Sequence, residues 1–452
     1  MTTAQPTTAA RLDRLPVTRL HRYLIAVVGV ATFFDLYDVF LASSVSTVLS
    51  KEFGVSGGEL KSLLASAFLG AFVGAVGLGR LADRIGRRRA FLFTLSLYSA
   101  FTLLGAFSTN VGMLVVCRFI AGIGLGAELP LADAYLADLL PARIRGRATA
   151  WAYTLGFCGV PAAGFLARGL LGHAPLGVAG WRWLFVVGAL GAVLVWLLRT
   201  GLPESPRWLI SQGRHEEAEK VLQRLERSAK KPLSETPDPE LRDQPEPAPQ
   251  RFSALFRPPW RRRSLMLTVL QILQVFGYYG FGSLVPIILA TKGFDLSHSL
   301  TFSALTFLGY PIGSALSIPM MERVQRKWLI VGSALGMAVF GLAFGYSTSG
   351  TAIAILGFCY TAISNIFSNA YHTYQAELFP TSLRGTAAGS AYSLSRLSTA
   401  AMPYLLLPVL QELGAGALFS VVAGAMVVLI VNVALFGPRT TGRSVEEIAM
   451  RD

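Results

Sequence analysis

Residues 135–148 read YLADLLPARIRGRA, and residues 374–387 read YQAELFPTSLRGTA. The two stretches align without a gap and share Tyr, Ala, Leu, Pro, Arg, Gly and Ala at the same places, with an offset of 374 − 135 = 239 residues. The same offset carries the acidic–basic dipeptide at 83–84 onto the one at 322–323. A single offset that fits independent stretches indicates an internal repeat, and therefore a chain built from two similar halves.

The composition is that of a chain embedded in a membrane. Of the 452 residues, 53% are hydrophobic and only 15% are charged, whereas soluble proteins carry about 25% charged residues. The net charge is +14, but the basic residues stand between apolar runs, as the positive-inside rule requires, so we expect no nucleic-acid partner. The three cysteines lie inside apolar runs and predict neither a disulfide framework nor a metal site.

Hydrophobic runs of membrane-spanning length recur along the whole chain. We predict an all-α membrane protein with two pseudo-symmetric six-helix halves, residues 1–200 and 263–452, joined by a polar linker over 201–262. The twelve predicted transmembrane helices cover residues 23–49, 60–82, 90–108, 111–137, 147–171, 182–200, 264–290, 299–321, 328–346, 351–377, 385–408 and 414–437.

Loop charges predict the orientation of these spans. Alternate short loops hold about twelve Arg and Lys residues, against about three (Lys51, Arg182 and Lys292) in the loops on the other side. The basic side faces the cytoplasm under the positive-inside rule, so both termini and the linker are predicted to be cytoplasmic, with the protein in the cell membrane.

Several motifs resemble those of the major facilitator superfamily. GRLADRIGRRR (79–89) is similar to its loop between the second and third helices, and RFIAGIGLGAELP (118–130) to its fourth-helix motif. PESPRWL (203–209) resembles the sugar-porter-like branch. FGYYGFGSLVP (276–286) and YQAELFPTSLRGTAAGSAYSLSR (374–396) look most like the proton-coupled transporters of niacin, aromatic acids and organic ions.

The resemblance implies a secondary transporter and not an enzyme. Such proteins move a small molecule by alternating access around a midplane site between the halves. We expect proton-coupled symport of a small organic anion, an aromatic or compact monocarboxylate, by a monomer without a cofactor. A sugar:proton symporter and an organic-cation or multidrug transporter remain alternatives, although QILQVFGYY (271–279) replaces the Gln/Asn motif of sugar porters in the seventh span.

Two carboxylates interrupt the first span. Asp35 lies 13 residues beyond Arg22, roughly 20 Å into a hydrocarbon core about 30 Å thick. A charge at that depth costs at least about 2.5 kcal/mol on insertion scales, and such residues are usually functional. Asp38 follows three residues later on nearly the same face. Proton coupling is our preferred interpretation, with substrate contact or a structural pair with an arginine as alternatives.

The fourth span adds Arg118 and Glu128. The family resemblance makes Arg118 part of proton or conformational coupling and Glu128 a cavity or gate residue, and an ion pair with a neighbouring helix is the competing interpretation. We therefore predict a proton-coupling group that consists of Asp35, Asp38, Glu128 and Arg118.

Arg396 lies near the middle of the eleventh span. A guanidinium group stays charged and matches a carboxylate in shape, so Arg396 is predicted to hold an anionic substrate, unless it forms a permanent salt bridge with one of the first-span aspartates. Other polar and aromatic residues of the seventh, tenth and fifth spans are predicted to line the same pocket. The predicted substrate contacts are Arg396, Gln274, Tyr278, Tyr279, Asn365, Asn369 and Phe157.

The cytoplasmic motifs repeat a carboxylate seven residues before an arginine. Such pairs are each worth about 0–1 kcal/mol at a water-exposed face, which suits a latch that opens and closes in every cycle. The predicted cytoplasmic gate consists of Asp83, Arg84, Asp138 with Arg145, Glu377 with Arg384, and Glu204 with Arg207.

Overall fold

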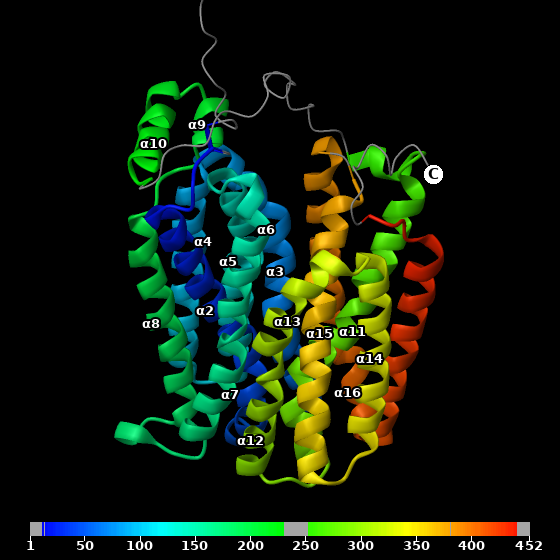
Figure 1. Ribbon diagram of the computed structural model, residues 1–452. Coiled ribbons are helices and arrows are strands. Elements are labelled where there is room, and N and C mark those ends of the chain that lie inside the picture. The colour runs from blue at the N-terminus through cyan, green and yellow to red at the C-terminus, as the bar shows by residue number, and fades with distance from the viewer. Residues whose placement is uncertain (1–10, 13, 230–251, 380, 441–452) are drawn as a thin grey trace, which may run out of the picture.

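The computed structural model describes residues 11–12, 14–229, 252–379 and 381–440, and every regular element in these ranges is a helix (Figure 1). Eleven of the helices are long and apolar enough to cross a membrane. The elements before the linker are α2 (Arg19–Glu52), α3 (Gly57–Ile85), α4 (Arg87–Ala106), α5 (Val111–Leu139), α6 (Ala142–Phe157), α7 (Gly159–Leu170), η1 (Pro175–Gly177) and α8 (Gly180–Thr200).

The elements of the linker region and of the second half are helices as well. Two short helices, α9 (Pro206–Ser211) and α10 (His215–Arg227), stand at one end of the bundle, which we call the linker side (Figure 1). The remaining elements are η3 (Phe252–Phe256), α11 (Arg261–Thr291), α12 (Leu296–Phe307), α13 (Gly309–Arg323), α14 (Arg326–Tyr346), α15 (Gly350–Glu377) and α16 (Thr381–Phe436).

The fold class predicted from the sequence is confirmed, with local differences at three places. Two predicted spans are each broken in the middle, because Pro161 and Pro311 have no N–H to donate to the carbonyls of Phe157 and Phe307, where α6 and α12 end. The last two predicted spans form the single element α16, in which Gly414 has φ 81°. Figure 1 shows that α16 crosses the bundle once and then returns, so twelve segments cross the described bundle.

Glycines bring the helices of each half into backbone contact. A Cβ atom at Gly122 or Gly126 of α5 would stand 2.2 or 2.1 Å from the carbonyl oxygen of Ala67 or Ala71 in α3. Small residues of this kind allow the close helix packing that is common in lipid. Gly70 and Gly74 of α3 make the matching approach to α5, and the glycines 239 positions further on, Gly309 and Gly313, do the same between α13 and α15.

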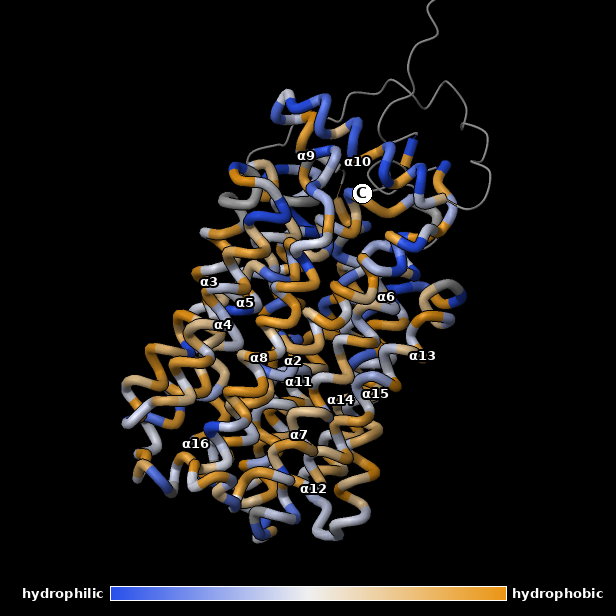
Figure 2. The backbone as a smooth tube through the Cα atoms, turned by 90° about the vertical axis from the view of Figure 1, so that its left-hand side faces the viewer, coloured by the Kyte–Doolittle hydropathy of each residue, from blue (hydrophilic) through white to orange (hydrophobic). Residues whose placement is uncertain are grey.

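The two halves contact each other at mid-depth and on the side away from the linker. Ser62 Oγ of α3 lies 3.1 Å from Tyr404 Oη of α16, and the ring of Phe40 lies edge-on to Phe307 at 5.7 Å. Figure 2 shows hydrophobic residues along the body of the bundle and hydrophilic ones gathered at the end that carries α9 and α10.

The N-terminal segment fastens α10 to the first half. Leu12 and Leu15 are buried in the same hydrophobic cluster as Leu222 of α10. Arg11 donates hydrogen bonds to Glu226 at 3.0 and 2.9 Å, and these bonds hold the pKa of that carboxyl below its usual value.

The packing of α3 against α5 predicts the effect of adding one methyl group. Gly126→Ala places a Cβ against the Ala71 carbonyl, so we expect the apparent melting temperature in detergent to fall by several degrees, as overpacking costs about 1–3 kcal/mol. Gly77→Ala in α3 is the matched control, because nothing lies within 4 Å of its added Cβ. Equal melting temperatures for the two variants would contradict the proposed close packing.

Candidate functional site

A cavity of about 260 Å³ lies between the two halves and extends toward the linker side. It is lined by residues of α2, α5 and α6 from the first half and of α11, α15 and α16 from the second. One phenylalanine and several tyrosines stand on its wall, namely Phe157, Tyr278, Tyr279, Tyr371 and Tyr392. The cavity therefore combines residues that are far apart in the sequence at the place where alternating access requires a substrate site.

Arg396 supplies a positive charge to this cavity. Its Nη2 donates to Tyr279 Oη at 2.6 Å, and its guanidinium carbon lies 4.7 Å from the ring centre of Tyr279 and 4.6 Å from that of Tyr392. The side chain is buried, its Nε has no hydrogen-bond partner, and no carboxylate of the described residues pairs with it. The aromatic rings stabilise the cation but leave its forked donors able to bind an anion.

Asp35 of α2 faces the same group from the other half. A smaller cavity joins Asp35 to Tyr279, Tyr392 and Arg396. The aspartate is 4% exposed, and its Oδ2 is buried without a hydrogen-bond partner. An unpaired carboxylate in such a position is costly while it is charged, which favours a group that takes up a proton.

Asp38 differs from Asp35 because it has a charged partner in this conformation. Arg118 of α5 donates to Asp38 Oδ2 at 2.5 Å and to the backbone oxygen of Asp38 at 3.1 Å. Both side chains are about 2% exposed. The two first-span aspartates therefore have different environments, and the ion pair holds α2 against α5.

Glu128 is also paired, and it is not among the residues that line the two cavities between the halves. It forms an ion pair with Arg199 of α8 and accepts a hydrogen bond from Thr94 Oγ1 at 3.2 Å. The guanidinium carbon of Arg199 lies 4.2 Å from the ring centre of Phe91. Glu128 thus forms the ion pair with a neighbouring helix that was the competing interpretation, in a buried contact among α4, α5 and α8, and its part in proton coupling remains a prediction.

Five of the seven predicted substrate contacts lie on the wall of the cavity, namely Phe157, Tyr278, Tyr279, Asn369 and Arg396. Gln274 and Asn365 are not on that wall, so the structure does not place either of them at the predicted contact. Their amides serve helix packing instead, because Gln274 Nε2 donates to Gln271 at 3.4 Å and Asn365 Nδ2 donates to the Tyr310 carbonyl at 2.5 Å.

The predicted gate residues lie at the linker side. Asp138 accepts a hydrogen bond from Ser205 Oγ at 2.7 Å and lies 3.9 Å from Arg87 Nε. Arg145 and Arg207 are near enough to Asp138 to interact with its charge. Asp138 is thus surrounded by several donors, whereas the prediction paired it with Arg145 alone.

The other gate carboxylates also have defined partners. Glu204 accepts hydrogen bonds from the backbone N–H groups of Arg88 at 3.1 Å and Ser205 at 3.0 Å. Glu377 pairs with Arg326 at 2.9 Å. Arg84 is exposed. The side chains of Asp83 and Arg384 lie outside the described residues, so the predicted contacts of these two remain predictions.

Sequence reasoning missed several polar residues of the cavity, among them Asp133, Tyr153 and Tyr392, and it also missed Arg199, the partner of Glu128. Asp133 and Tyr153 form a hydrogen-bonded pair on the cavity wall, and Tyr392 lies one helical turn before Arg396 on the same face. That i, i+4 spacing is a usable signal. Arg199 carries no such signal, because it lies at the end of its span, where arginines usually only set topology.

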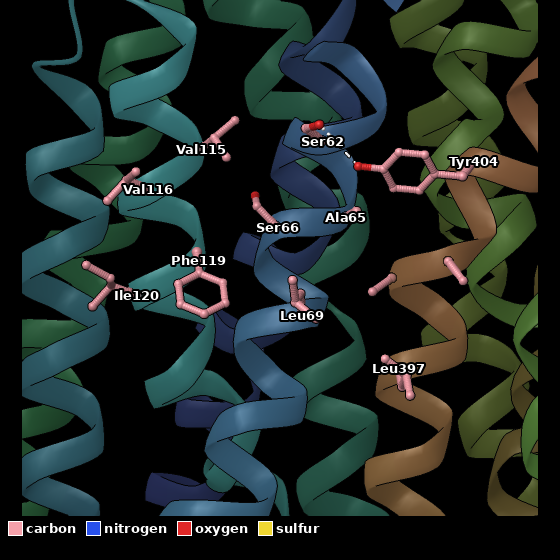
Figure 3. Close-up of a pocket in the computed structure, with 12 residues that line it drawn as sticks. Ser62, Ala65, Ser66, Leu69, Val115, Val116, Phe119, Ile120, Leu397 and Tyr404 are labelled. Atoms are coloured by element: carbon pink, nitrogen blue, oxygen red, sulfur yellow. Dashed lines mark hydrogen bonds between the residues drawn. The ribbon is translucent and has the colours of Figure 1, made fainter. Parts of the chain in front are cut away.

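A larger apolar groove of about 730 Å³ lies on the outer surface of the bundle (Figure 3). It runs between α3, α5 and α16, and Figure 3 shows the hydrogen bond between Ser62 and Tyr404 at its edge. Leu69 and Val116 expose 42% and 56% of their surface there. Such a face suits lipid tails, and it offers no charged group to bind a polar substrate.

The chain matches the model of the "Sugar (and other) transporter" family over residues 23–451 and belongs to that family within the major facilitator superfamily. The resemblance inferred from the motifs is therefore confirmed, and the protein is a transporter and not an enzyme.

Curated relatives match almost the whole chain. The putative metabolite transport protein YyaJ of Bacillus subtilis is 31% identical over 97% of this chain and 96% of its own. The niacin transporter NiaP of Acinetobacter baylyi is 29% identical over 98% and 99%. The 4-hydroxybenzoate transporter PcaK of the same organism is 27% identical over 83% and 82%.

A solved structure shares the fold. The xylose transporter XylE from E. coli, in a partially occluded inward-open conformation, superposes with a TM-score of 0.75 at 22% identity, covering 94% of this chain and 99% of that one. At that identity the likeness shows the major facilitator fold.

Asp38 has a buried ion-pair partner and Asp35 has none, so changes at the two sites should lower the stability of the protein by different amounts. Arg118→Met leaves the Asp38 charge buried and unpaired, which costs about 3–5 kcal/mol, so the apparent melting temperature in detergent should fall strongly. The double variant Asp38→Asn/Arg118→Met should recover most of that loss. Asp35→Asn should cost nothing, because Asp35 has no partner to lose. A fall for Asp35→Asn as large as that for Arg118→Met would contradict the unpaired state of Asp35.

Proposed function

We propose that this transporter is a symporter that moves a small organic anion, an aromatic or compact monocarboxylate, together with protons. The observation that carries the proposal is Arg396, a buried guanidinium in the cavity with no carboxylate partner in the described chain. A buried cation in this position requires an anionic partner. A substrate carboxylate meets this requirement, because it can accept two parallel hydrogen bonds from the guanidinium group.

The size and lining of the cavity support a small ring-containing substrate. Its volume of about 260 Å³ lies just below the range of about 300–1,000 Å³ that is usual for drug-sized ligands. Phe157 stacks on Tyr310 with their ring centres 6.3 Å apart, and Tyr278 stands edge-on to Tyr279 at 4.9 Å. These rings offer faces and edges against which a planar aromatic acid packs.

Asp35 supplies the coupling to protons in this proposal. While Asp35 is ionised, its charge attracts Arg396 across the smaller cavity that joins them. Protonation of Asp35 removes that attraction and leaves Arg396 free for the substrate carboxylate. Asp38 and Glu128 serve as structural charges, because each already has its own arginine.

The orientation remains part of the proposal. The positive-inside rule places the linker side, and with it both termini, in the cytoplasm. The cavity extends toward that side, with Asp133 and Gln375 on its wall near the linker-side ends of α5 and α15. The conformation described here then exposes the substrate site to the cytoplasm, while Ser62 of α3 and Tyr404 of α16 join the two halves on the opposite side.

Two other substrate classes make different predictions. A sugar symporter, the class suggested by the likeness to XylE, depends on amides and hydroxyls and is indifferent to Arg396. An organic-cation transporter uses a carboxylate as its counter-charge and gains affinity when Arg396 is removed.

Replacement of Arg396 distinguishes the three classes. We expect Arg396→Ala to lower the affinity for benzoate by about 10–100-fold, because a charge-assisted hydrogen bond is worth about 1.5–3 kcal/mol. Binding of benzoate, xylose and tetraethylammonium is measured by calorimetry on the purified protein in detergent. Gln274→Met, behind the wall, is the control that should bind benzoate normally. Unchanged benzoate affinity in Arg396→Ala would refute the anion site.

The proposed role of Asp35 in proton coupling is tested by measuring whether a pH gradient drives uptake. Asp35→Asn in liposomes should lose accumulation of benzoate driven by an imposed pH gradient, because the amide cannot carry the proton. The same variant should keep exchange of labelled for unlabelled benzoate, since the site itself remains. Accumulation against a gradient by Asp35→Asn would show that another group carries the proton.

A further inference from the structure

A second charged side chain of the cavity has no role in the mechanism so far. Asp133 of α5 is the one acidic residue on the wall of the larger cavity, as far as the chain is described. Its side chain is exposed to that space, and its Oδ1 accepts a hydrogen bond from Tyr153 Oη of α6 at 2.6 Å. No basic residue of the described chain pairs with it.

Tyr153 orients the Asp133 carboxylate but leaves most of its hydrogen-bond acceptor sites unoccupied. A carboxylate has about four acceptor sites on its two oxygens, and the tyrosine occupies one of them. The remaining acceptors are open to the cavity, where water fills them as long as no ligand is bound. A ligand that displaces this water without supplying a donor leaves a charged acceptor unpaired, which is unfavourable.

Asp133 and Arg396 give the cavity two poles of opposite charge. Arg396 comes from α16 of the second half, and Asp133 from α5 of the first. Tyr392 is placed between them, with its ring centre 4.6 Å from the guanidinium carbon and its hydroxyl near enough to interact with the charge of Asp133. Aromatic side chains line the cavity that contains both poles.

We infer that Asp133 and Tyr153 form a specificity-determining pair that accepts a hydrogen bond from the substrate at the end opposite its carboxylate. This inference rests on the proposed function, since Arg396 holds the carboxylate. The preferred substrate is therefore a ring carboxylate that carries a donor, either a hydroxyl or an ammonium group, and a carboxylate without a donor binds more weakly. Arg396 and Asp133 belong to different halves, so only a ligand that carries both a carboxylate and a hydrogen-bond donor contacts both of them.

The test compares four para-substituted probes on the purified full-length protein by calorimetry. They are benzoate, 4-hydroxybenzoate, 4-(aminomethyl)benzoate and 4-methoxybenzoate, in which the methyl group blocks the donor. We expect 4-hydroxybenzoate to bind about tenfold more tightly than 4-methoxybenzoate, the effect of one hydrogen bond to a charged group. The aminomethyl compound carries a charged ammonium donor, so its affinity can be compared with that of the compound that carries a neutral hydroxyl donor.

Two variants connect this preference to the pair. Asp133→Leu should abolish both donor preferences, and binding of benzoate to this variant shows that it folds. Asp133→Asn should abolish mainly the preference for the ammonium compound, because the amide oxygen still accepts from a hydroxyl. Tyr153→Phe, which keeps the charge but frees the carboxylate, should weaken the preference only partly.

The outcomes separate this inference from the proposed function. Equal affinities for the hydroxy and methoxy compounds, or a donor preference that survives Asp133→Leu, overturn the role of Asp133 while the anion site remains. Failure of all four carboxylates to bind, or binding that does not depend on Arg396, overturns the proposed function and this inference together.

Discussion

A charge buried at the depth of a bilayer must have a counter-charge, and this requirement organises the whole core of the protein. The first half satisfies it internally for two of its carboxylates, through Arg118 with Asp38 and Arg199 with Glu128. Those pairs fasten α5 to α2 and α8, and breaking either would leave an uncompensated ion. The buried Asp35 has no such partner, and the cation that shares the smaller cavity with it, Arg396, belongs to the other half.

Close helix packing allows each half to keep its own charges in place. The backbones of α3 and α5 approach so closely at Gly122 and Gly126 that no Cβ fits between them. Gly309 and Gly313 give α13 the same relation to α15 in the second half. Such contacts make each half rigid, so relative motion is confined to the surface between the halves, where the cavity lies.

The sequence predicts the fold better than it predicts the site. The repeat offset and the apolar runs are sufficient for twelve crossings in two halves, because membrane insertion depends on local hydrophobicity. The difference between Asp35 and Asp38 depends on Arg118, which is 80 positions from Asp38 in the chain, and spacing alone places both aspartates on one face. Asn365 likewise has the periodicity of a wall residue, yet its amide is bound to the Tyr310 carbonyl, and only the packed structure shows that.

Charge balance across the two halves explains why a proton and an anion would travel together. Asp133, which is exposed to the larger cavity, is left out of this balance. The three buried carboxylates Asp35, Asp38 and Glu128 exceed the two arginines that pair with them by one negative charge, which Arg396 balances from the second half. Protonation of Asp35 together with binding of one carboxylate at Arg396 leaves this balance unchanged. Either step alone changes it by one unit, and an unbalanced charge in a site closed from water costs several kcal/mol. In the proposed mechanism, empty and fully loaded transporters therefore reorient more readily than half-loaded ones, and that difference would be the physical basis of coupling.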